Sequence, residues 1–227
     1  MLTKPLRIAG LFLLFAAPAT AAAPVPATMA PLADYLIPRD AEIALARSAA
    51  PPSIAAGATV LVLGPHNYET AATGTNGFTC LVERGWESDF GNTDFWNPRV
   101  RGPLCFNAEA ARTVMPSHLE RTDWALAGLS MDQMHERARA SALANATPAP
   151  GAMCFMLSKD GYLAGAGSHW HPHLMFYLPA AGVASWGANL PGSPVIGGPG
   201  DPEPVVTYMI TVTKWSDGSS ALEMAHP

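Results

Sequence analysis

The order of apolar segments along this chain constrains its fold more than any other feature. Strand-type runs occupy both ends of the chain, and helical spacing occupies its middle. The strand-type runs are 58–63, 68–72, 77–84, 153–157, 174–178, 205–214 and 221–224, and the helical segments of the middle are 108–115, 117–127 and 130–146. Strands, then helices, then strands, without regular alternation, indicate an α+β domain with a mostly antiparallel sheet.

Local signals refine this prediction at three places. The runs 68–72 and 77–84 are separated by Thr, Gly, Thr and Asn, a composition that favours a hairpin turn. A further helix is predicted over 40–48, because acidic residues come early in it and two prolines follow it. Ser130, followed three residues later by Gln133, predicts a capping box at the start of the last helix.

Two segments lack periodicity and are predicted to be long loops. They are 85–107, which gathers aromatic residues among Gly, Asn, Asp and Pro, and 182–204, which is rich in Pro and Gly. Irregular stretches of this length inside a compact domain are uncommon unless they are functional or tied down. Function is therefore expected in these loops.

The N-terminus has the pattern of a secretory signal peptide over residues 1–21. Lys4 and Arg7 precede an apolar run at 8–17, and small residues follow, with Ala19 and Ala21 in cleavage positions. The alternative, an uncleaved anchor, is less favoured because the run has half of the about 20 residues that a membrane-spanning helix needs. We predict a periplasmic or secreted protein with an exposed lead-in at 22–38 and a single α+β domain at 39–227.

The charge of the chain argues against two kinds of partner. The net charge is −5, and removal of residues 1–21 takes away two of the 13 basic residues and none of the 18 acidic ones, leaving −7. Nucleic acids and anionic lipid surfaces require clustered Lys and Arg. A small molecule, a metal ion or another protein remains as the expected partner, and the sequence leaves the oligomeric state open.

Export would place Cys80, Cys105 and Cys154 in an oxidising compartment, where two of them can pair. We favour a bridge between Cys80 and Cys105, because the irregular segment between them gains most from closure, about 3–4 kcal/mol from chain entropy. Cys154 would then be a buried thiol. The alternative is that all three cysteines are free and buried.

The segment SHWHPH is the main candidate for chemistry. It places His169, His171 and His173 at alternate positions, which share one face of an extended strand. Alternate residues lie about 6.6 Å apart, whereas two imidazole nitrogens on one zinc ion approach to about 3.3 Å. Two of the three histidines can therefore bind zinc or another divalent transition metal together, with a remote donor. The donors considered are His66, His118 and Glu69.

Two other interpretations of the histidines stay open, a structural or pH-responsive cluster and a catalytic histidine without metal. The nucleophile-elbow, phosphate-binding-loop, dinucleotide-binding and Cys-x-x-Cys motifs are all missing from the sequence. The sequence therefore does not decide whether the protein is an enzyme.

The alternative function is a non-catalytic module that binds a small ligand through its aromatic loops. Trp96 and Trp170 would form an aromatic wall, and Arg99 and Arg101 would donate to an anionic ligand. The structural alternative is that the tryptophans anchor loops on the core. The arginines would then pair with nearby acids, namely Asp89, Asp94 or Glu87.

Five strings are specific enough to support a resemblance to other proteins. They are ARSAAPPSI at 46–54, GTNGFTCLVER at 74–84, FWNPRVRGPLCFN at 95–107, SHWHPHLMFY at 168–177 and WGANLPGSPV at 186–195. With these strings the chain resembles a family of uncharacterised exported bacterial proteins over most of its mature length. The resemblance implies export, and it implies no activity, substrate or cofactor.

Overall fold

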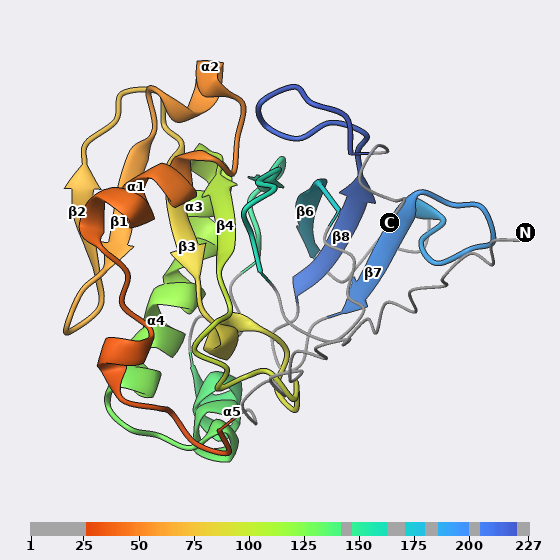
Figure 1. The fold of residues 1–227 in the computed structure, drawn as a ribbon. Helices are drawn as coiled ribbons and strands as arrows, with labels where there is room; N and C mark the ends of the chain where they lie inside the picture. Colours follow the sequence, from red (N-terminus) through yellow and green to blue (C-terminus); the bar gives the residue numbers. More distant parts are fainter. Residues whose placement is uncertain (1–25, 142–146, 163–170, 180–185, 200–204, 222–227) are drawn as a thin grey trace, which may run out of the picture.

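A mixed sheet of eight strands organises the described part of the chain, residues 26–141, 147–162, 171–179, 186–199 and 205–221 of a computed structural model (Figure 1). Its strand order is β2-β1-β3-β4-β5-β6-β8-β7. The strands are β1 Thr59–Leu63, β2 Tyr68–Ala72, β3 Thr79–Glu83, β4 Gly102–Phe106, β5 Met153–Met156, β6 His173–Pro179, β7 Val195–Pro199 and β8 Val205–Thr211. Among these strands only β1 and β3 pair in parallel, which confirms the α+β class with a mostly antiparallel sheet.

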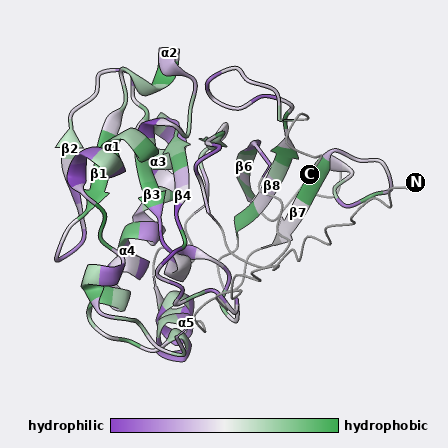
Figure 2. Cartoon of the chain, in the orientation of Figure 1, coloured by the Kyte–Doolittle hydropathy of each residue, from purple (hydrophilic) through white to green (hydrophobic). Residues whose placement is uncertain are grey.

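Helices cover both faces of one half of the sheet. They are η1 Leu32–Asp34, α1 Arg39–Arg47, α2 Pro52–Ala55, η2 Gly85–Glu87, α3 Ala108–Thr113, α4 Met115–Leu126 and α5 Met131–Ala140. Alternation along β3 sends Leu81 into the core beneath α3 and α4, and sends Cys80 and Val82 into the core beneath α1. Hydrophobic residues follow β1 and β8 in Figure 2. Of the described helices, none has the length and hydropathy needed to cross a bilayer.

The predicted helices form, and so does the predicted capping box; residues 142–146 of the predicted helix 130–146 and residues 222–224 of the predicted last strand lie outside the described residues. Ser130 and Gln133 make the reciprocal bonds of a capping box at the start of α5, with Ser130 N donating to Gln133 Oε1 at 2.9 Å. Asn107 caps α3 by accepting from Ala110 N at 2.9 Å. These bonds satisfy backbone N–H groups that a first helical turn leaves without partners.

The predicted hairpin between 68–72 and 77–84 is wrong. Strand β2 pairs with β1, and the chain then crosses the end of β1 so that β3 runs parallel to β1 on its other side. Gly74 permits this crossing, because a Cβ atom there would lie 2.2 Å from Thr59 N. The Gly-rich turn therefore serves a close approach of two chain segments rather than a hairpin.

Both predicted long loops contain a strand, which corrects those predictions. Strand β4 lies within 85–107 and is buried along its whole length between β3 and β5, so it shows no polar alternation. Strand β7 lies within 182–204 and pairs with β8, where Gly197 lets the backbones approach, since a Cβ would lie 2.1 Å from Thr207 O.

The predicted exposed lead-in at 22–38 needs a correction at Tyr35. This side chain is fully buried, and its hydroxyl donates to Trp96 O at 2.8 Å. Its ring lies 4.9 Å from the ring of Trp86. The described part of the lead-in thus packs against a core cluster beneath α5. That cluster also contains Phe95, Trp124 and Met134.

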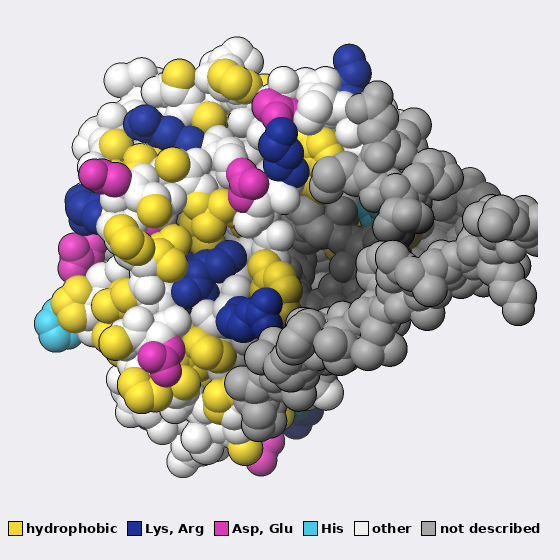
Figure 3. Space-filling model, viewed as in Figure 1, with side chains coloured by type: hydrophobic (Ala, Val, Ile, Leu, Met, Phe, Trp, Pro, Cys, Tyr) yellow, Lys and Arg dark blue, Asp and Glu magenta, His cyan; other side chains and the backbone are white. Residues whose placement is uncertain are grey.

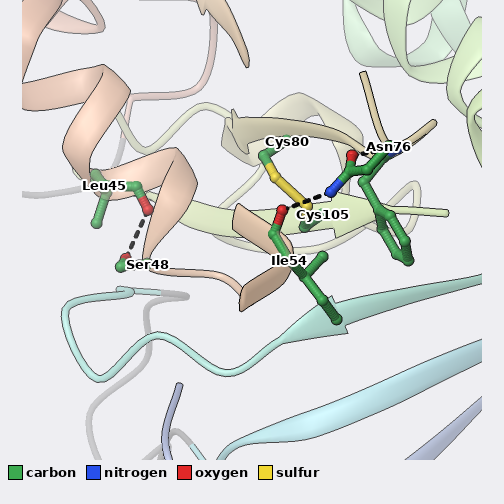
Figure 4. Close-up of a disulfide and its surroundings, with 7 residues drawn as sticks. Leu45, Ser48, Ile54, Asn76, Cys80 and Cys105 are labelled. Atoms are coloured by element: carbon green, nitrogen blue, oxygen red, sulfur yellow. Dashed lines mark hydrogen bonds between the residues drawn. A yellow bond between two sulfur atoms is a disulfide. The ribbon is translucent and has the colours of Figure 1, made fainter. Parts of the chain in front are cut away.

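The predicted disulfide between Cys80 and Cys105 is confirmed. The two cysteines stand directly opposite each other on β3 and β4, on the side of the sheet that α1 and α2 cover (Figure 4). Close by, Asn76 donates to Ile54 O at 2.7 Å and so fastens the crossing segment to α2. Cys154 is a free and buried thiol, as predicted, and burial raises its pKa well above the ordinary value.

A buried ion pair joins α1 to the end of β3. Glu42 Oε1 lies 2.8 Å from Arg84 Nη2, and both side chains are essentially inaccessible to solvent. Glu42 Oε1 also accepts from Leu63 N at 3.1 Å, and Arg84 donates to the carbonyls of Tyr35 and Val82. The pair therefore satisfies backbone groups at the ends of two strands.

Loss of this pair should cost far more stability than loss of an exposed pair. We expect Glu42→Ala to lower the free energy of unfolding by about 3–5 kcal/mol, because Arg84 would keep a buried charge without a partner. The matched control is Glu109→Ala, which breaks a helical but exposed pair with Arg112 and should cost at most about 1 kcal/mol. Urea denaturation measures both, and equal losses would contradict the role assigned to Glu42.

Candidate functional site

Three side chains of metal-ligand type converge between the sheet and α4. Glu83 ends β3, Glu87 ends η2 and His118 lies on α4, and one donor atom from each lies within 4.8 Å of the others. His118 Nδ1 is 2.9 Å from Glu83 Oε1 and 3.5 Å from Glu87 Oε2. In the described part of the chain this is the one group of three such residues.

Local structure explains why these residues meet. Glu83 points to the same face as Leu81 because side chains alternate along β3. Gly85 then passes against the backbone of a neighbouring loop, where a Cβ would lie 2.5 Å from Asp94 O, and η2 brings Glu87 back over the sheet. His118 and Thr122 are four residues apart on α4, so they share the helix face that meets both glutamates.

Glu87 is the most constrained member of the cluster. Its side chain is 0% exposed, and its Oε1 accepts from Thr122 Oγ1 at 2.9 Å. Trp86 Nε1 in turn donates to Thr122 Oγ1 at 3.0 Å, and Tyr68 Oη approaches Glu87 Oε1 at 3.5 Å. These contacts occupy one carboxylate oxygen and leave the other, Oε2, directed at His118.

Two buried atoms of the cluster lack hydrogen bonds within the described structure. They are Glu87 Oε2 and His118 Nδ1. The ring nitrogen lies 2.9 Å from Glu83 Oε1 and 3.5 Å from Glu87 Oε2, so its described contacts with the carboxylates are ion pairs. Buried polar atoms are normally bonded, so this pair of atoms indicates a missing partner.

The cluster is electrostatically coupled. Burial alone would lower the pKa of His118, but the carboxylates of Glu83 and Glu87 outweigh it and raise the pKa to about 9. Burial raises the pKa of Glu83, against the opposing effect of His118. The folded chain thus holds an imidazolium between two glutamates at neutral pH.

The surroundings of the cluster are apolar on one side and reach solvent on the other. The ring of Phe106 meets the His118 ring edge-on at 5.3 Å. Beyond it, Cys154 Sγ and Tyr177 Oη lie 3.3 Å apart in the core. The side chains of Glu83 and His118 are 14% and 15% exposed, so the cluster borders the solvent, although His118 Nδ1 is itself buried.

The SHWHPH segment lies only partly within the described residues. His169 and Trp170 are outside them, and His171 precedes β6, which begins at His173. His173 is buried, and its Nδ1 donates to His171 O at 2.8 Å, because a carbonyl can only accept. Burial lowers the pKa of His173, which keeps its ring neutral. Metal binding at His169, His171 and His173 stays a prediction.

The remote donors considered for this motif lie elsewhere. His173 on β6 is separated from Glu83 on β3 by β4 and β5, about 14 Å across the sheet. His118 therefore lies with the two glutamates and not with His173. His66 is in the turn between β1 and β2, and Glu69 is on the edge strand β2.

The residues predicted to bind a ligand have different environments. Trp96 is 4% exposed and packs edge-on against Phe95 at 4.8 Å, so it anchors its loop in the core. Arg99 lies over the ring of Tyr162 at 4.7 Å, and Arg101 Nη1 donates to two backbone carbonyls. Ligand binding by these residues stays a prediction.

Comparison with known proteins finds no matching family model, no matching curated protein and no matching solved structure. The sequence reasoning named His118 but missed Glu83 and Glu87. The two glutamates are four residues apart across the end of a strand, and they meet His118 only when α4 packs on the sheet. Sequence motifs for metal sites depend on fixed spacings between ligands, and these three residues come one each from a strand, a 3-10 helix and an α-helix.

His118 should make the stability of the chelator-treated protein depend on pH. Its pKa is raised from 6.5 to about 9 in the folded chain, so its contribution to the free energy of unfolding is present below pH 6.5 and is lost as pH rises through about 9. We expect the stability difference between wild type and His118→Gln to shrink across this range in urea denaturation. A difference that stayed constant would show that His118 is not charged in the folded state.

Proposed function

We propose that this chain is an exported protein that binds one divalent transition-metal ion, zinc or a similar ion, through Glu83, Glu87 and His118. The observation that carries the proposal is the pair of buried atoms, Glu87 Oε2 and His118 Nδ1, that face each other without a hydrogen bond. Both atoms are ordinary ligands of zinc. A metal ion would take the place of the proton on Nδ1 and bond to both.

The distances between the donor atoms fit a shared ion. Two ligand atoms that are each about 2.1 Å from a metal, at angles between octahedral and tetrahedral, lie about 3.0–3.4 Å apart. His118 Nδ1 is 2.9 Å from Glu83 Oε1 and 3.5 Å from Glu87 Oε2. Both distances to His118 Nδ1 are thus within a few tenths of an ångström of this range, and all three donor atoms lie within 4.8 Å of one another.

The composition of the cluster fits a divalent transition metal rather than calcium or magnesium. Two carboxylates balance a charge of +2, and an imidazole nitrogen favours zinc and its neighbours over ions that bind oxygen alone. Three protein ligands leave a position for water on the side where Glu83 and His118 reach solvent. Such an ion lowers the pKa of its bound water, so hydrolysis or hydration is the class of reaction that the site supports.

Export is supported by two observations of different kinds. Residues 1–21 have the order of a signal peptide, and Cys80 and Cys105 form a disulfide that suits an oxidising compartment. We propose a periplasmic or secreted location on this basis.

The histidines of SHWHPH are the second candidate for a metal site. His173 Nδ1 donates to the backbone carbonyl of His171 at 2.8 Å. Metal-binding histidines commonly have this arrangement. The same experiment distinguishes the two sites.

Metal binding should depend on Glu87 and not on an exposed glutamate. In calorimetric titration of chelator-treated, tag-free protein with Zn²⁺, we expect one ion per chain and at least about tenfold weaker binding by Glu87→Gln and His118→Gln. The control Glu136→Gln, on an exposed side chain of α5, should bind as wild type does.

Two results would contradict this assignment. One is unchanged zinc affinity in both cluster variants together with loss of binding in His171→Ala, which would assign the metal to the SHWHPH segment. The other is the absence of saturable binding of Zn²⁺, Mn²⁺ or Co²⁺ by the wild-type protein.

A further inference from the structure

Two arginines just before β4 carry positive charge that no described acidic side chain neutralises. Within the described residues no carboxylate lies within 4.0 Å of Arg99 or Arg101, so the expected pairs with Asp89, Asp94 or Glu87 do not form. The chain as a whole is acidic, with a net charge of −5. Arg101 differs from an ordinary surface arginine because it is only partly exposed and still has no described carboxylate partner.

Arg101 is held in place by its backbone and by one end of its guanidinium. Its N and O atoms form a β-bridge with Tyr162, and its Nη1 donates to Pro98 O at 2.6 Å and Val100 O at 2.7 Å. The donors on Nε and Nη2 have no acceptor among the described residues. One side of a fixed guanidinium therefore remains available to an acceptor from outside the described chain.

Arg99 is positioned beside Arg101 by the same residue, Tyr162. The Arg99 guanidinium carbon is 4.7 Å from the centre of the Tyr162 ring. The loop is braced by Asn97, which donates to Asp94 Oδ1 at 2.8 Å and accepts from Arg99 N at 3.0 Å. Tyr162 thus contacts both residues, Arg99 at its guanidinium and Arg101 through backbone hydrogen bonds.

The nearest buried charges do not compensate these arginines. Burial, with the charge of Arg84 as the second cause, lowers the pKa of Arg101 to about 10. Glu42 opposes this shift, but it is already bonded to Arg84. On the face shown in Figure 3, basic side chains come together near the centre, with no acidic side chain between them.

We propose that Arg99, Arg101 and Tyr162 form a site for a small dianionic oxyanion, a phosphate or a dicarboxylate. A guanidinium presents parallel N–H donors that match two oxygens of such a group, and two arginines match its two charges. The flat ring of Tyr162 holds Arg99 in a fixed direction, which reduces the entropy lost on binding. This site is independent of the metal site, because it shares no residue with it.

The test is titration of chelator-treated protein with inorganic phosphate and, separately, malonate, at constant ionic strength set with chloride. We expect saturable one-to-one binding of at least one of the two, with affinity lower by about 10- to 100-fold in Arg101→Gln and in Arg99→Gln. Arg101→Lys keeps the charge but loses the parallel N–H donors of the guanidinium, so this variant should also bind the anion less tightly than wild type. The control Arg39→Gln removes an exposed arginine of α1 that has no described acidic partner, and it should bind as wild type does.

The two anions identify the ligand chemistry, since preference for phosphate indicates a tetrahedral group and preference for malonate indicates a dicarboxylate. Arg99→Gln keeps the test valid if loss of Arg101 unfolds the loop, because the described contact of the Arg99 side chain is the exposed one with Tyr162. Equal binding by wild type, Arg99→Gln and Arg101→Gln would overturn the proposal. So would failure of both anions to bind more tightly than chloride.

Discussion

The Glu42–Arg84 ion pair is the interaction on which the rest of the structure depends. Strands β1 and β3 are parallel neighbours, but they pair only through Thr59 and Val60 of β1. Beyond that point the strands separate, and backbone groups that a longer ladder would satisfy need other partners. Glu42 accepts from Leu63 N on one side of the gap, and Arg84 donates to Val82 O on the other. A buried ion pair here replaces part of a sheet ladder.

The same separation connects the ion pair to the candidate metal site. Val82 O accepts from Arg84 and also from Tyr68 Oη at 2.7 Å, and Tyr68 Oη reaches towards Glu87. Alternation along β3 directs Glu83 towards α4 and Arg84 towards α1, so consecutive residues carry opposite charges to opposite faces. The disulfide at Cys80 fixes the same strand to β4. Strand β3 therefore determines the relative positions of α1, α4 and both charge clusters.

Features that depend on neighbours in the sequence were predictable. The capping box at Ser130 and the strand-type runs up to 205–214 are read within a few residues, and they form as expected, as does the order that defines the α+β class. The disulfide was predictable as well, because export and an irregular segment between two cysteines favoured one pairing. In each case the physical cause lies in local propensity or in chain entropy.

Features that depend on which strands become neighbours were not predictable. The turn at 73–76 has hairpin composition, yet β3 gains more burial beside β1, where Val60 and Cys80 enter the core under α1. Strands β4 and β7 form within Pro- and Gly-rich stretches that give no strand signal. They form because neighbouring strands supply their backbone hydrogen bonds. Glu83 and Glu87 were missed for a related reason, since His118 reaches them only after α4 packs on the sheet.

The ion pair also affects which charges are compensated near the two proposed sites. Glu42 is committed to Arg84, so Arg101 keeps its positive charge without a buried counter-charge. On the other face, Glu83 and Glu87 contact the imidazole of His118, and the charge of Arg121 also lowers the pKa of Glu83. Acidic and basic side chains therefore lie together under α4, whereas Arg99 and Arg101 before β4 have no carboxylate within 4.0 Å among the described residues. The buried Glu42–Arg84 pair lies at the gap between β1 and β3, and its two charges neutralise each other apart from both groups.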